Sequence, residues 1–216
     1  MADWIALPAL ILIAVTALTL LLAPEWRTGI WALAVQYIGV FLLTGLNWPF
    51  EMAITKLVSG GMACTVLGIA LLSIPSQNHL EAGSFAAAPA GPPGGAQTTP
   101  GRPVLSGYVF RLIAAILVGL TTFSLAEGVP AQAPQIDLLT ARAGLLLTGL
   151  GLLQMGFSTR TLRTILGLLT TLSGFEILYS AVESSTLVAG LLSGVTLGMA
   201  MAGAYLLIAP HMEEME

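Results

Sequence analysis

Two ionisable side chains, Lys56 and Glu176, lie inside segments that otherwise have the composition of membrane-spanning helices. Lys56 lies in FEMAITKLVSGGMACTVLGIALLS, and Glu176 lies in LRTILGLLTTLSGFEILYSAV. A charged side chain near the middle of a bilayer costs roughly 2.5–3.5 kcal/mol on insertion scales. Such residues usually face the interior of a helix bundle, a partner subunit or a water-filled path. They are therefore the first candidates for chemistry in this chain.

Each of these residues has more than one interpretation. Glu176 could carry protons and change its charge during work, pair with a partner subunit, or remain protonated without a role. Lys56 could be the buried partner of a carboxylate in this chain or another, or it could extend its ammonium group to the interface, because it follows Glu51 by only five residues. Gln36, in the middle of WALAVQYIGVF, can hydrogen-bond across helices or hold water, and is the third candidate for an ion path.

The composition indicates which elements must position these side chains. Hydrophobic residues make up 56% of the chain and charged residues 8%, with a mean hydropathy of +0.91, whereas soluble domains carry about 25% charged residues. This favours an all-α, polytopic integral membrane protein. Because about 20 apolar residues span a bilayer, we predict seven transmembrane helices: Trp4–Leu22, Thr28–Trp48, Phe50–Ser73, Tyr108–Leu125, Leu138–Phe157, Leu162–Val182 and Thr186–Ile208.

Small residues recur at four-residue spacing in two of these segments. This spacing lets helix backbones approach closely in lipid. The predicted helix-packing residues are Gly60, Cys64 and Gly68 in the third segment, and Gly190, Gly194 and Gly198 in the seventh. Their similarity indicates a possible parallel repeat of a three-helix unit, in which helices 1–3 match helices 5–7 and helix 4 is the connector.

The predicted helices and their connections divide the chain into four regions. Residues 1–74 form a first three-helix membrane unit, and 138–216 form a second one with an acidic tail. Residues 108–137 form the connector helix and an outer loop, in which Pro130 and Pro134 are expected to mark the connection. Residues 75–107, rich in Pro, Gly and Ala, are expected to be a flexible cytoplasmic linker, either a plain tether or a strap that docks a partner.

The basic residues predict the orientation. Cytoplasmic loops are enriched in Lys and Arg, and with seven spans the following residues fall on one side: Arg27, Arg102, Arg111, Arg160 and Arg163. We therefore expect an integral cytoplasmic-membrane protein with its N-terminus outside and its C-terminus cytoplasmic. On the outer side, Arg142 is expected to pair with Asp137.

The sequence lacks the residues that several classes of function require. The single cysteine, Cys64, excludes an intramolecular disulfide and cysteine-based metal clusters. His79 and His211 lie far apart without ligand spacing, so we expect no metal and no cofactor. The net charge of −4 and the lack of a basic patch argue against nucleic acid. The start, MADWIAL, lacks the positive region of a cleaved signal peptide.

Short motifs resemble a known family of membrane subunits. GFEILYSAV, around Glu176, resembles the GLEIMxNA segment of the K-subunit of complex I and its relatives in cation antiporters. The first half resembles component E of hydrogenase-4, whose FITK segment is similar to AITK at Ala53–Lys56. Its SxRxxLRxIxG turn is similar to STRTLRTILG at Ser158–Gly167, with one residue fewer here.

The resemblance implies a function and also differs from the family at two positions. It implies a non-catalytic membrane-arm subunit of a complex-I-like or group 4 membrane-bound hydrogenase-type assembly, contributing Glu176, Lys56 and Gln36 to a proton or ion path. Partners would be antiporter-like and quinone- or hydrogenase-module subunits, which would hold the redox chemistry. The K-subunit's second carboxylate would fall near Gly194–Val195 and is absent, and the hydrogenase relative's glutamate would align near Leu172.

Two other hypotheses remain open. The chain could be a structural membrane scaffold that holds neighbouring helices by its glycine faces without a proton role. It could also be a self-contained small transporter, although the scarcity of polar groups within the spans makes this the weakest of the three.

Overall fold

The computed structural model describes residues 3–23, 25–73, 103–158 and 160–213. These ranges form seven helices and no strand: α1 (Asp3–Leu22), α2 (Trp26–Asn47), α3 (Phe50–Ser73), α5 (Pro103–Gln132), α6 (Leu138–Gly156), α7 (Thr161–Val182) and α8 (Thr186–Glu213). Six of them are long and apolar enough to cross a membrane, and α1 contains the shorter apolar stretch Ala6–Leu22. The predicted class, an all-α polytopic membrane protein, is confirmed.

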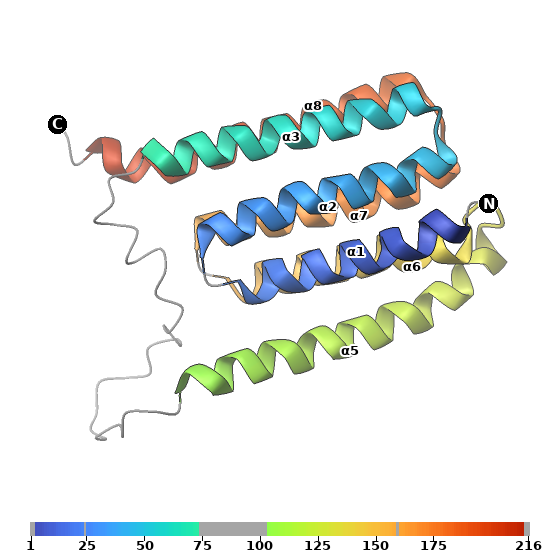
Figure 1. Cartoon of the computed structure of the whole chain (residues 1–216), viewed down its shortest axis with the longest axis horizontal. Coiled ribbons are helices and arrows are strands. Elements are labelled where there is room, and N and C mark those ends of the chain that lie inside the picture. Colours follow the sequence, from blue (N-terminus) through green and yellow to red (C-terminus); the bar gives the residue numbers. More distant parts are fainter. Residues whose placement is uncertain (1–2, 24, 74–102, 159, 214–216) are drawn as a thin grey trace.

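The helices form two stacked layers, α1–α2–α3 and α6–α7–α8 (Figure 1). The contacts join α1 to α6, α2 to α7 and α3 to α8 across the layers. Figure 1 shows that both layers have the same helix order and that each stacked pair runs in the same direction. A twofold rotation would instead place α1 against α8. The second layer is therefore related to the first by a shift across the stack, with α5 beside α1 and α6.

One close helix crossing occurs in both layers at corresponding positions. In the first layer, a Cβ added at Gly39 of α2 would lie 2.5 Å from Ile13 Cγ2 and 3.7 Å from the Ala9 carbonyl oxygen of α1. In the second layer, a Cβ at Gly174 of α7 would lie 2.6 Å from the backbone nitrogen of Thr148 and 2.7 Å from the Gly144 carbonyl oxygen of α6. Ala9, Ile13 and Gly39 correspond to Gly144, Thr148 and Gly174 at one constant offset in the sequence. Glycine permits this approach because it has no Cβ.

The two ends of the bundle differ in chemistry. The hairpin end carries the short joints Asn47–Phe50 and Glu183–Ser185. There the Trp48 indole Nε1 donates to the carbonyl oxygen of Glu183 at 2.8 Å, which ties the two joints together. The opposite end, here called the arginine end, carries Arg27, Arg111, Arg160 and Arg163.

Helix α5 is longer than its sequence indicated. It extends through Pro130 to Gln132, so Pro130 does not mark the connection. A proline removes only the hydrogen bond from its own backbone nitrogen to the carbonyl oxygen four residues earlier, so in the last turn it leaves the rest of the helix intact. At its other end α5 begins at Pro103, and Pro103–Gly107 are therefore helical rather than part of the linker. Proline is well tolerated in a first turn, where no N–H partner is required. Positions 74–102 of the expected linker lie outside the described residues.

The pairing expected for Arg142 is wrong. The Arg142 Nη2 atom lies 3.6 Å from Glu127 Oε1 of α5, and the guanidinium group stacks over the Phe123 ring at 5.4 Å. Asp137 instead caps the N-terminus of α6, where its carboxylate accepts the Leu139 backbone N–H at 3.2 Å. An aspartate at this position satisfies an amide that has no partner within the helix, and Arg142 is positioned against α5 instead.

Candidate functional site

Lys56 and Glu176 meet between the two layers. Lys56 lies six residues beyond the start of α3, and Glu176 lies six residues before the end of α7. Both of these helix ends are at the hairpin end of the bundle (Figure 1). With a rise of about 1.5 Å per residue, the two side chains are at the same depth. They reach each other across the diagonal of the four helices α2, α3, α7 and α8.

The two side chains form a buried ion pair. The Lys56 ammonium group contacts Glu176 Oε2, and the side chains are 4% and 1% exposed. Lys56 Nζ also donates to the hydroxyl of Thr196 on α8 at 2.8 Å. Lys56 therefore does not extend to the interface, and its carboxylate partner belongs to this chain. In a region of low dielectric constant, such a pair is stable only when both charges are satisfied together.

Thr196 connects the two members of the pair. Its Oγ1 atom lies 3.5 Å from Glu176 Oε1 and 3.0 Å from the Leu192 carbonyl oxygen. A hydroxyl has a single proton, so it can donate to one of these oxygens at a time while it accepts from Lys56. The Thr196 hydroxyl can thus change its acceptor from its own helix to the carboxylate.

The ring of Tyr37 forms one wall of the site. Its centroid lies 5.5 Å from Lys56 Nζ, within the range of a cation–π interaction. Gly60 of α3 makes room for this ring, because a Cβ there would lie 2.4 Å from Tyr37 Cγ. The ring therefore stabilises the Lys56 ammonium group in addition to the Glu176 carboxylate.

Gln36 and Gln154 are two further buried polar side chains. Gln36 is 1% exposed and Gln154 is 3% exposed. Within the described part of the chain, neither amide atom of Gln36 has a hydrogen-bond partner, and the same holds for Nε2 of Gln154. Buried amides without a protein partner are uncommon, and strain, a functional role, water or an ion can account for them. Gln154 escaped the sequence argument because it lies near the end of its span.

The predicted helix-packing residues fall into two groups. Gly60 and Cys64 are buried, and Cys64 lies in the cluster of α2, α3, α7 and α8. Open space surrounds the other four positions, where an added Cβ would meet nothing within 4 Å: Gly68, Gly190, Gly194 and Gly198. The three α8 glycines are exposed, so they do not pack a helix of this chain. The small residues that hold α6 and α7 together, Gly144, Gly151, Gly167 and Gly174, were not predicted.

Other chemistry is sparse in the described ranges. No group of three metal-ligating side chains is found among those residues. The hydroxyls of Thr170, Ser173 and Ser180 on α7 are buried, and each donates to a carbonyl oxygen of its own helix. Such hydroxyls need no partner elsewhere.

Fold and site together define an integral membrane protein of two stacked three-helix layers, with the ion pair of Lys56 and Glu176 buried between them. Comparison of the chain with protein-family models, with characterised proteins and with solved structures finds no match. The argument for function therefore rests on the residues of the site.

Proposed function

We propose that this chain is a non-catalytic membrane-arm subunit of a complex-I-like or group 4 membrane-bound hydrogenase-type assembly, where it contributes to the translocation of protons or other cations. One observation carries the proposal: Glu176 and Lys56 form an ion pair that is buried at membrane depth between two layers of helices. A carboxylate there can gain a proton only together with a change at its lysine partner. Such coupling of charges is what an ion-translocating station needs.

The surroundings of the pair support a switch. A proton arriving on Glu176 would remove the negative charge that holds Lys56. The hydroxyl of Thr196 and the ring of Tyr37 would then be the remaining partners of the ammonium group. Gln36, buried without a protein partner, would extend the polar path from the same helix as Tyr37.

The motif resemblance around Glu176 and Lys56 supports the same assignment. Under this proposal, redox chemistry and cofactors belong to other subunits, namely antiporter-like proteins and quinone- or hydrogenase-module proteins. The N-terminus would lie outside and the C-terminus in the cytoplasm, because the arginine end would face the cytoplasm. The missing second carboxylate at Gly194–Val195 means that a neighbouring subunit must supply the next ionisable station.

The decisive experiment measures ion pumping by the assembled complex in reconstituted vesicles, normalised to electron transfer. Glu176→Gln should leave assembly largely intact, because the amide oxygen can still accept a hydrogen bond from Lys56, and it should lower the pumping ratio. Glu176→Asp should retain part of the activity, because an ionisable group survives on a shorter stem. Glu183→Gln is the matched control: this residue is exposed at the hairpin end and should have no effect. Pumping at the wild-type ratio by Glu176→Gln would remove the residue from the path.

A structural scaffold without a proton role is the alternative. It is favoured by the completeness of the pair, since Lys56 and Glu176 already neutralise each other and tie α3 to α7. In that case Glu176→Gln would weaken assembly and leave the pumping ratio of the surviving complex unchanged. Purification in mild detergent distinguishes both from a solitary protein: antiporter-like partners should co-migrate, and a lone homo-oligomer would contradict the proposal.

A further inference from the structure

Every helix of the first layer has an equivalent in the second. Helix α2 begins and ends 135 residues before α7 begins and ends, which is also the offset between Gly39 and Gly174. The starts of α1 and α3, moved by the same number of residues, fall within one residue of the starts of α6 and α8. Positions of the first layer can therefore be compared one by one with positions of the second.

Burial reverses between equivalent positions of α3 and α8. Lys56 and Ala63 of α3 are buried, and Lys56 contacts α8 and α7 from the first layer. Their equivalents on α8, Leu191 and Gly198, are exposed. The exposed face of α8 thus follows the pattern of the face of α3 that packs inside the chain.

The outer face of the first layer, toward the viewer in Figure 1, shows the opposite reversal. Trp31 and Ile38 of α2 are 74% and 47% exposed, whereas their equivalents on α7, Leu166 and Ser173, are buried. Leu166 packs against the first layer, because a Cβ added at Gly29 of α2 would lie 3.2 Å from its Cδ1 atom. The exposed face of α2 therefore follows the pattern of the packed face of α7.

The two outer faces are counterparts of the two faces that pack together between the layers. A second copy of the chain, moved by one further step across the stack, would bring the outer face of its first layer onto the outer face of the second layer below. Because stacked helices run in the same direction (Figure 1), this step lies in the plane of the membrane. Both copies would therefore keep the same orientation in the bilayer.

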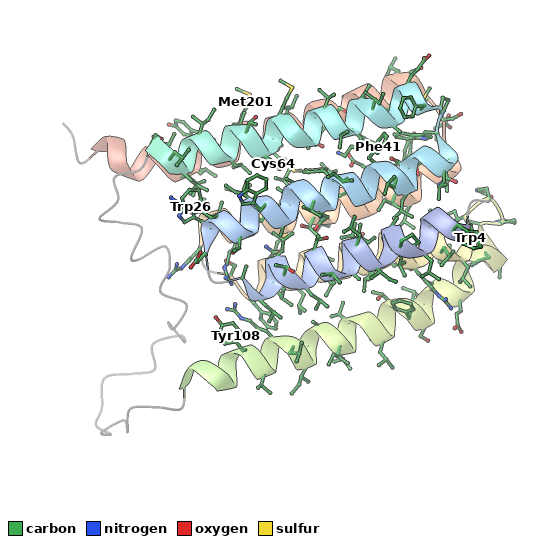
Figure 2. The ribbon with its side chains drawn as sticks, in the orientation of Figure 1. Trp4, Trp26, Phe41, Cys64, Tyr108 and Met201 are labelled. Carbon is green, nitrogen blue, oxygen red and sulfur yellow. The ribbon has the colours of Figure 1, made fainter. Side chains whose placement is uncertain are left out.

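Both charges of the ion pair have apolar equivalents on these outer faces. Leu191 stands at the position that corresponds to Lys56, and Phe41 of α2 stands at the position that corresponds to Glu176. In Figure 2, Phe41 lies between the ribbons of α2 and α3, and its ring is 6.0 Å from that of Phe50. In a contact between copies, Leu191 of one copy would face Phe41 of the next. Neither copy would then bring an unpaired charge into the interface, which would be costly.

Small residues on both outer faces permit a close approach. Gly61 of α3 and Gly198 of α8 have open space where a Cβ would lie. Gly61 is the equivalent of Thr196, which Lys56 contacts at 2.8 Å, so Leu191 of one copy is predicted to lie beside Gly61 of the next. Helix interfaces in membranes are enriched in small residues, whereas contact with lipid chains does not require them.

We propose that a second copy of this chain stacks on the first, with its outer face of α2 and α3 against the outer face of α7 and α8. The contact continues the interface that already joins the two layers of one chain. Such a head-to-tail contact leaves a free face at each end, so further copies can add. The inference does not depend on the proposed function: a stack without other subunits would support it and contradict the proposed function.

Cysteine crosslinking in the intact membrane tests the contact. Two differently tagged full-length chains, both with Cys64→Ala, are produced together, one with Leu191→Cys and the other with Gly61→Cys. A bismaleimide about as long as a lysine side chain should give a product that carries both tags. Leu117→Cys in place of Leu191→Cys is the matched control, because Leu117 is similarly exposed, 67% against 63%, but lies on α5.

A mixed product several-fold above the control supports the stack. Gly194→Leu, added to the Leu191→Cys chain, should abolish that product by overpacking, and it should leave the single chain intact because open space surrounds Gly194. The proposal is overturned if no mixed product forms, if the control gives as much, or if Gly194→Leu has no effect. A product between two Leu191→Cys chains would indicate a twofold contact instead of a shift. A crosslink from Leu191→Cys to a different protein would make that protein the occupant and overturn the assignment to a second copy.

Discussion

Lys56 and Glu176 can remain buried as charged groups only as a pair. Either residue alone would leave a charge buried in the bundle, because their side chains are 4% and 1% exposed. Loss of one partner from a buried pair is strongly destabilising, whereas replacement of both by apolar residues of similar volume is often neutral. The energetic role of the pair can therefore be separated from its role in ion transfer.

A double-mutant comparison makes this separation. Lys56→Met and Glu176→Leu should each lower the free energy of unfolding by about 3–5 kcal/mol, because each strands a buried charge. The double variant should be close to wild type in stability and inactive in ion pumping. Thermal and denaturant unfolding in detergent, followed by circular dichroism, measures the first effect. Additive losses in the double variant would show that the two residues do not stabilise each other.

At the residue scale, the sequence identified the two charged side chains but did not predict that they contact each other. The sequence did contain their equal distance from the hairpin end, since Lys56 lies six residues after the start of α3 and Glu176 lies six residues before the end of α7. No feature of the sequence indicated that Thr196 and Tyr37 belong to the site. Threonine and tyrosine occur throughout the spans, and a contact such as that of Lys56 with Thr196 joins helices far apart in the chain. Only the packing of the two layers places Thr196 and Tyr37 beside the ion pair.

At the scale of helices, the contact of α6 with α7 depends on small residues. A Cβ at Gly174 would lie 2.7 Å from the Gly144 carbonyl oxygen, and backbone atoms cannot move aside as a side chain can. Gly174→Ala should therefore lower stability by about 1–3 kcal/mol. Gly61→Ala is the matched control on α3, because an added Cβ there meets nothing within 4 Å. Equal melting temperatures for the two variants would contradict this account of the crossing.

The exposed glycines of α8 lead to a different expectation. Gly198→Leu should leave the stability of the isolated chain unchanged, because open space surrounds this position. Small residues at four-residue spacing favour close helix contact in lipid, so the same substitution should reduce recovery of the assembled complex by overpacking, at a cost of about 1–3 kcal/mol. Complex recovery after affinity purification measures this. Unchanged recovery would mean that the stripe faces lipid.

Helix boundaries were predictable where the chain turns tightly. Phe50–Ser73 was predicted with the observed bounds, because Pro49 and the short joint Asn47–Phe50 leave no alternative. The bounds of α5 were not predicted correctly, because Pro103 and Pro130 both lie in terminal turns, where proline does not end a helix. The sequence identifies a proline but not which turn of a helix contains it.

At the scale of the whole molecule, the predicted orientation depends on counting α1 as a seventh span and on the side that carries the basic residues. We expect a cysteine at Ser184, which is exposed at the hairpin end, to react with a membrane-impermeant reagent from outside. A cysteine at Ser84, between the third and fourth spans in sequence, should react only from the cytoplasmic side. Buried Cys64 should contribute little background. Labelling of Ser84→Cys from outside, or of Ser184→Cys only from inside, would reverse the orientation.

The stacking of the layers could be anticipated only in part. The recurrence of small residues indicated two units in the same orientation, but it pointed to α8 glycines that face outward. The crossing that the two layers share uses Gly39 and Gly174, each in the middle of an otherwise ordinary apolar helix. Which glycine meets a backbone depends on the rotation of each helix, and a nearly uniform apolar sequence does not encode that rotation clearly.

The ion pair also has a consequence for the chain during its synthesis. During synthesis, α3 enters the membrane before α7 exists, and about 120 residues separate Lys56 from Glu176, which at roughly 5–20 residues per second takes about 6–24 s. For that interval the lysine has no carboxylate partner from α7, although its position six residues beyond the start of α3 would let the ammonium group reach the surface. The arrival of Glu176 would then draw it inward. The order of the sequence therefore predicts that α3 first lies shallow in the membrane and moves deeper once α7 is present.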